Sequence, residues 1–73
     1  MNTQKNIVGR VLRKELAARG MSIQELAERT HYSLSHLYHV LGGQVLVGWD
    51  LAVALGKEFG TSAEIWYRLG RDE

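Results

Sequence analysis

The sequence contains neither cysteine nor proline among its 73 residues. The absence of cysteine excludes a disulfide framework and a thiolate metal site, and it fits a reducing cytosol. Without proline, no helix of the chain is kinked or ended by that residue. The sequence also lacks an apolar run long enough to cross a bilayer and an N-terminus of the signal-peptide type. We therefore expect a cytoplasmic protein with no membrane association.

Net charge is also small, because nine lysine and arginine residues oppose eight acids to give +1. Overall charge thus gives little support for nucleic-acid binding, and a basic surface has to come from placement. The placement is uneven, because the first segment holds Lys5, Arg10, Arg13, Lys14 and Arg19 with only Glu15 against them. This pattern fits either an ordinary solvated helix face or a helix that faces phosphates.

Apolar residues recur at helical spacing outside the central part of the chain, and they predict three helices there. The first spans about residues 4–19 and ends at Gly20. Its inner side chains are Val8, Val11, Leu12 and Leu16. Another helix runs from Gly48 or Trp49 to about Glu58, and its inner side chains are Leu51, Leu55 and Phe59. A short last helix is capped by Thr61 or Ser62, and its apolar contacts are Ile65, Trp66 and Leu69.

The central stretch, SIQELAERTHYSLSHLYHVLGG at residues 22–43, predicts two short helices in succession. Ser22 is a good N-cap, and Glu25 three residues later completes a capping box. Ser33 caps the second helix, and two glycines end it. The link between the helices is the turn at residues 29–32, in which His31 is expected to adopt a positive φ. Such a pair is typical of a helix-turn-helix, whose second helix usually lies in the major groove of DNA.

The inner faces of these two helices are apolar at the spacing that the motif needs. The side chains expected to face inward are Ile23, Leu26, Ala27, Leu37, Val40 and Leu41. With the three outer helices they predict an all-α domain of five helices, a single unit over residues 1–73 with the motif at about 22–42.

The sequence resembles the Xre/Cro/phage-repressor family of helix-turn-helix regulators, over nearly all of residues 8–69. The motifs that carry the resemblance are GRVLR at 9–13, RGMS at 19–22, ELAER at 25–29, YSLS at 32–35, LGG at 41–43 and EFGTS at 58–62. The last of these continues as AEIW, which is similar to antitoxins of the HigA type. The resemblance implies a compact lambda-repressor-like domain, encoded by a bacterium or a phage.

The resemblance also implies which residues meet DNA. In this family the outer residues of the recognition helix, residues 33–41 here, enter the groove. The expected base contacts are Leu34, Ser35, Tyr38 and His39, with His36 at the flank. The expected backbone contacts are Ser22, Ser33, Arg10, Arg13 and Gln44. Ser35 and His39 offer hydrogen bonds to base edges, and Leu34 offers only a contact with a thymine methyl group.

Three places depart from the family pattern by being apolar. The family usually has a polar residue where this chain has Ile23, and a polar or basic one where it has Leu34. The connector after the recognition helix is commonly basic with proline, but here it is QVLVG at 44–48. An exposed apolar patch usually marks a protein interface. The expected residues are Val45, Leu46, Val47 and Trp49, which pair two copies or hold a toxin or other protein, unless Val47 and Trp49 fold back into the core.

The sequence shows no pattern of catalysis. It has no nucleophile–base spacing, no paired carboxylates in an apolar setting and no phosphate-cradling glycine loop. His31, His36 and His39 are close in sequence but lack an acidic or cysteine partner, so we expect no metal and no cofactor. The prediction is a non-enzymatic repressor that binds a palindromic double-stranded DNA operator as a homodimer. The alternative is an antitoxin, or an adaptor that binds protein through the patch at 45–49.

Overall fold

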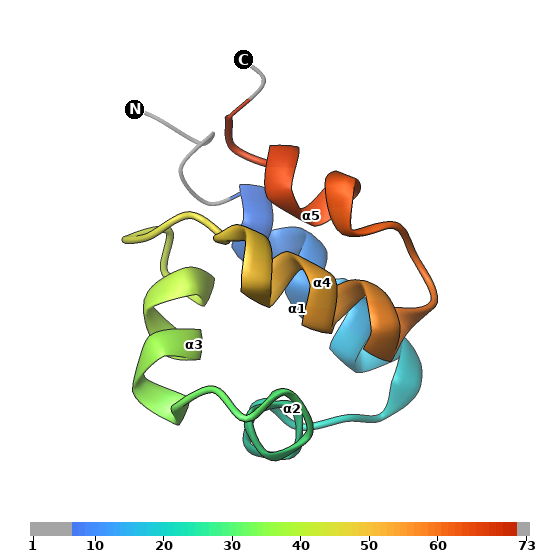
Figure 1. Ribbon diagram of the computed structural model, residues 1–73. Coiled ribbons are helices and arrows are strands. Elements are labelled where there is room, and N and C mark those ends of the chain that lie inside the picture. The colour runs from blue at the N-terminus through green and yellow to red at the C-terminus, as the bar shows by residue number, and fades with distance from the viewer. Residues whose placement is uncertain (1–6, 72–73) are drawn as a thin grey trace.

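The computed structural model describes residues 7–71, which form five α-helices and no strand. The helices are α1 (Ile7–Arg19), α2 (Ile23–Thr30), α3 (Leu34–Leu41), α4 (Trp49–Phe59) and α5 (Ala63–Arg68). The predicted all-α fold with five helices is thus confirmed. Figure 1 shows α3 at one side of the molecule, with α2 below it and α5 at the opposite end from α2.

One apolar core joins all five helices. Most of the side chains that helical spacing predicts lie in it, because residues three and four apart share a helix face. The fully buried large side chains are Val8, Leu12, Leu26, Leu37, Val40, Val47, Leu51, Leu55 and Trp66. The helix α4 packs against α5 and α2, whereas α3 packs against α1 and α2. The helix α3 is therefore supported on its inner side by α1 and α2.

The chain reverses tightly between α4 and α5. Gly60 ends α4 with φ 71°, a left-handed conformation that glycine adopts without strain. The Thr61 amide then donates to the Gly56 carbonyl at 3.0 Å. A β carbon on Gly56 would lie 2.7 Å from the Thr61 carbonyl oxygen, so only glycine lets the returning backbone come this close. This reversal lays α5 across α4.

The C-terminal helix differs in part from its prediction. Ser62 is the N-cap, because its hydroxyl accepts from the Ile65 amide at 3.3 Å. Thr61 instead accepts from Trp66 Nε1 at 2.9 Å, which lets the buried indole keep its hydrogen bond. Trp66 is 1% exposed and belongs to the core of the chain. Ile65 is 53% exposed, so its predicted core contact is wrong: neighbouring residues of a helix point about 100° apart, and Trp66 is the one that faces the core.

The boundaries of two outer helices shift slightly. The described part of α1 begins at Ile7, and the predicted residues 4–6 lie outside the described range. The helix α4 continues one residue past the predicted end at Glu58. In the part of the chain that the structure describes, no helix has the length and apolar character that a bilayer span requires.

Candidate nucleic-acid interface

The helix α2 begins as its sequence predicts. The Ser22 hydroxyl accepts a hydrogen bond from the Glu25 amide at 3.0 Å, which satisfies one of the unpaired donors of the first turn. The Glu25 carboxylate instead accepts from Arg29 at 3.2 Å. Only the serine half of the predicted capping box is therefore present within residues 7–71.

The turn between α2 and α3 is shorter than predicted. Thr30 is still helical and buried, and its hydroxyl donates to the Leu26 carbonyl at 2.8 Å. The predicted turn at residues 29–32 therefore starts two residues too early. His31 ends the helix with φ 64°, as expected, and no other described residue except glycine has a positive φ. A single left-handed residue thus redirects the chain into α3.

The helix α3 is fixed at both ends and along its inner face. The Ser33 hydroxyl accepts from the His36 amide at 3.0 Å. At the other end, the Gly42 amide donates to the Tyr38 carbonyl at 2.9 Å. The inner side chains Leu37, Val40 and Leu41 are buried, as predicted. Capping and packing together hold this short helix rigidly against the domain.

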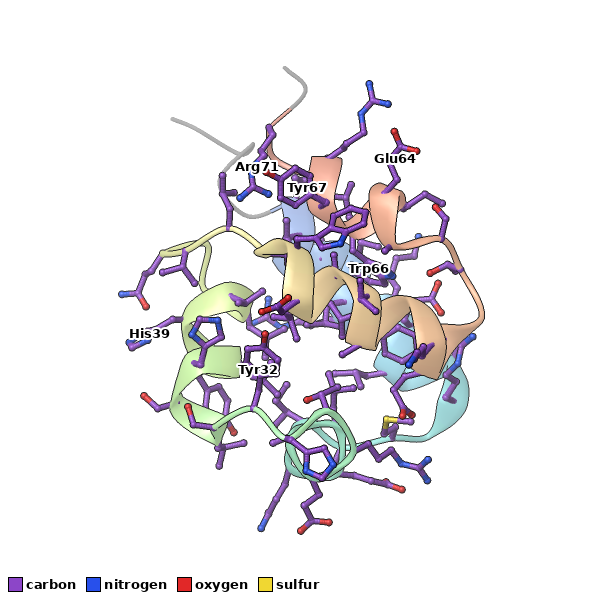
Figure 2. The ribbon with its side chains drawn as sticks, in the orientation of Figure 1. Tyr32, His39, Glu64, Trp66, Tyr67 and Arg71 are labelled. Atoms are coloured by element: carbon purple, nitrogen blue, oxygen red, sulfur yellow. The ribbon has the colours of Figure 1, made fainter. Side chains whose placement is uncertain are left out.

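The outer face of α3 is open to solvent. Leu34 is 37% exposed and Tyr38 is 54% exposed. Ser35 and His39 are exposed as well, and no side-chain hydrogen bond holds either of them within the described chain. Figure 2 shows His39 on the outer side of α3, whereas Tyr32 points toward the other helices. The structure thus places all four predicted base-contact residues on one accessible face.

His36 differs from these residues in its surroundings. It is half-buried, and its ring lies 5.4 Å from the Tyr32 ring, centroid to centroid. Tyr32 is itself packed against the core. The predicted place of His36 at the flank of the face follows from this contact, because the ring is held over the turn.

The predicted basic segment divides into two parts. Arg10, Arg13 and Lys14 are exposed on the side of α1 away from the core, where the helical spacing sets them on one face. Within residues 7–71, no ion pair joins any of these three to an acid. Arg13 extends over Gly9, where α1 meets α3. These three side chains are therefore free of acid partners, and Arg13 lies near the contact of α1 with α3.

Arg19 is not available in the same way. Its guanidinium pairs with Glu15, donates to the Phe59 carbonyl at 2.8 Å and lies 4.8 Å from the centre of the Phe59 ring. It therefore joins α1 to the end of α4. The predicted contribution of Lys5 falls outside the described residues.

The connector after α3 is only partly as predicted. Gln44 is exposed. Its backbone amide donates to the His39 carbonyl at 2.9 Å, so the hydrogen bonds of α3 continue past the end of the helix. Val45 and Leu46 are exposed at 37% and 39%. Val47 is completely buried, so its predicted place on a partner surface is wrong. It lies in the core because the connector must turn inward before α4 begins.

Tyr67 and Arg71, two residues that sequence reasoning missed, complete this surface around Trp49. Trp49 is 52% exposed and does not fold back into the core, and its ring meets the Tyr67 ring edge-on at 5.5 Å. The Arg71 guanidinium donates to the Val47 carbonyl at 2.7 Å and lies 4.1 Å from the centre of the Tyr67 ring. Figure 2 shows Tyr67 and Arg71 side by side above the connector. We call Leu46, Trp49 and Tyr67 the apolar patch.

No group of three or more histidine and acidic side chains lies within reach of one metal ion in the described residues. That His31, His36 and His39 bind no metal ion remains a prediction from the sequence. What the described face offers is an exposed helix without aspartate, glutamate, lysine or arginine, packed against a helix that carries exposed basic side chains.

The family of the chain follows from comparison with known proteins. A family model described as a helix-turn-helix domain matches residues 7–65. Because this match covers most of the sequence, the chain belongs to the helix-turn-helix domain family. Membership indicates a DNA-binding regulator, and such domains are typically non-enzymatic. No curated protein and no solved structure gives a significant match.

Proposed function

We propose that the chain is a sequence-specific transcriptional regulator of the Xre/Cro type, a small Cro-like or phage-type repressor. One observation carries the proposal: α3 is capped by Ser33, packed on its inner side and open on its outer side. A helix presented in this way enters the major groove with its N-terminal residues at the base edges. Ser35 and His39 then supply hydrogen bonds to bases.

The basic helix supplies the sequence-independent part of binding. Arg10, Arg13 and Lys14 have no acid partner among the described residues, so they retain their charge for phosphates. Ser22 and the first amides of α2 add a helix N-terminus, which attracts an anion. Ser33 caps α3 and Gln44 follows its C-cap, which supports both as further backbone contacts.

Homodimerisation through the connector follows from the same arrangement. Val45, Leu46 and Trp49 expose apolar surface next to the end of α3. Two copies joined there around a two-fold axis present two recognition helices to one side of a duplex. Half-sites of a palindrome are then about 34 Å apart.

Affinity for DNA as a function of salt tests this function. A duplex pool of random sequence is bound to the full chain, and the enriched duplex is titrated at several salt concentrations. We expect an enriched palindrome whose affinity falls steeply as salt rises, because counterions are released. An unenriched pool with affinity that is weak and independent of salt contradicts the proposal.

An antitoxin or protein-binding adaptor is the second candidate, and the apolar patch favours it. Leu46, Trp49 and Tyr67 come from the connector, α4 and α5, and together they offer a protein partner more apolar surface than a DNA-binding domain needs. Leu46→Glu separates the candidates. A repressor then becomes monomeric and loses cooperative operator binding, whereas an adaptor loses its partner and has no DNA affinity to lose. Ile65→Glu, at an exposed site outside the patch, is the control.

A further inference from the structure

The chain carries no aspartate, glutamate, lysine or arginine from residue 31 to residue 48. This segment contains the turn before α3, all of α3 and the connector. The exposed side chains of α3 also include no asparagine or glutamine. In the major groove, arginine and lysine form paired hydrogen bonds with guanine, and asparagine and glutamine form them with adenine. The outer face of α3 therefore lacks the usual means of reading purines.

What this face offers instead is apolar surface at its leading end. Leu34 is the first residue of α3, and Tyr38 follows one turn later on the same face. Both side chains are more than one-third exposed. In a helix of this kind, the N-terminal residues are the ones that contact base edges. Leu34 thus occupies the position of closest approach to the bases.

A leucine at this position discriminates between base pairs through solvation. Against a hydrogen-bonding base edge it displaces water and returns no bond, which costs free energy. Against a thymine it removes apolar surface from water on both sides, because thymine alone presents a methyl group in the major groove. The chemistry of Leu34 therefore favours thymine among the four bases.

We propose that this face recognises double-stranded DNA through thymine C5-methyl groups, with Leu34 as the residue that contacts them. This proposal rests on the proposed DNA-binding function and names the chemistry of its ligand. The charges support this occupant: Arg10, Arg13 and Lys14 lie on the neighbouring helix, and α3 itself bears no acid that would repel a phosphate.

The test removes the methyl group without changing any hydrogen bond. The probe is the duplex enriched from the random pool, in which each thymine is replaced in turn by deoxyuridine. We expect one position in each half-site at which the replacement weakens binding by about fourfold, the effect of losing one buried methyl group. No other replacement on the same strand should weaken binding to that extent.

Leu34→Ala identifies the residue responsible. The variant should bind the thymine duplex about as weakly as the native chain binds the duplex that carries uracil at this position in both half-sites, and the uracil replacement should then have no further effect. Ile65→Ala, another exposed aliphatic residue outside this face, should keep the full fourfold discrimination. The melting temperature of each variant shows that it is folded.

The outcomes separate this proposal from the function on which it rests. An enriched duplex whose affinity is unchanged by every uracil replacement overturns the thymine proposal and leaves the DNA-binding function in place. Uracil sensitivity that persists in Leu34→Ala overturns the role of Leu34. A pool with no enriched duplex overturns both. If Leu34→Ala does not fold, the uracil series on the native chain still decides the thymine proposal.

Discussion

Gly9 on α1 lies directly against the backbone carbonyl of Leu41, the last residue of α3. A β carbon on Gly9 would overlap that oxygen, and the oxygen cannot move away independently because it belongs to the backbone of α3. The absence of a side chain at this one position therefore sets the distance between the basic helix and the helix proposed to read DNA.

Gly9→Ala is therefore expected to destabilise the domain, although alanine is the better helix former. Forcing the two helices apart should cost about 1–3 kcal/mol of unfolding free energy, in the range of other overpacking substitutions. Urea denaturation followed by circular dichroism measures it. Gly48→Ala is the control, since a β carbon there meets no atom within 4 Å. Gly48 is the N-cap of α4, where glycine is preferred to alanine, so this variant should lose only about 0.5–1 kcal/mol. Equal stability of the two variants contradicts the close approach.

His31→Gly should stabilise the domain. A left-handed conformation costs a residue with a β carbon about 1–2 kcal/mol, and glycine gives back about 0.5–1 kcal/mol through its freer unfolded chain. The net gain expected at φ 64° is about 0.5–1 kcal/mol. His39→Gly removes the same imidazole from the last turn of α3 and should lose about 0.5 kcal/mol. A loss of stability in both variants argues against strain at His31.

Ser33→Ala and Ser35→Ala should separate stability from base preference. Ser33 accepts a hydrogen bond from the His36 amide, so its loss should cost about 1 kcal/mol. Ser35 is exposed with no such bond among the described contacts, so its substitution should be nearly neutral for unfolding. In binding to variant duplexes, Ser35→Ala should relax the preference at one base pair. A Ser35→Ala protein with unchanged preference removes Ser35 from the proposed contacts.

Arg13→Ala should weaken binding to all duplexes alike. Because Arg13 is proposed to contact phosphate, its loss should also reduce the slope of log affinity against log salt by about one for each bound protomer. Lys57→Ala is the matched control. Lys57 is an exposed cation on the last turn of α4, at the end of that helix farther from α3 (Figure 1), and its loss should leave the slope unchanged. Equal slopes for the two variants contradict the assignment of Arg13.

Much of the fold is predictable because the local signals agree with one another. Ser22, Ser33 and Ser62 each sit one residue before an apolar repeat of helical spacing, and each forms the cap that this position predicts. His31 is predictable for a similar reason, because a short polar link between two helices needs one residue of positive φ. Caps, spacing and turn chemistry depend only on neighbours in sequence.

The errors concern residues whose place depends on distant neighbours. Val47 and Leu46 are adjacent apolar residues in a connector, and nothing local tells which of them turns inward. Ile65 and Trp66 present the same choice in α5, where the hydroxyl of Thr61 favours burial of the indole. The ring contact of Tyr67 with Trp49 and the hydrogen bond from Arg71 to the Val47 carbonyl form only after α5 packs on α4. The residues of the proposed DNA face remain predictions of the resemblance and the exposure.

In the proposed function, the absence of aspartate, glutamate, lysine and arginine from residue 31 to residue 48 puts attraction to DNA and selectivity in different parts of the molecule. Exchanging one neutral side chain of α3 for another leaves the electrostatic pull of α1 untouched. A gene for such a domain can therefore acquire a new target by a single neutral substitution while its occupancy of DNA in general stays the same. Paralogues that diverge in this way would share one chromosome without competing for each other's sites.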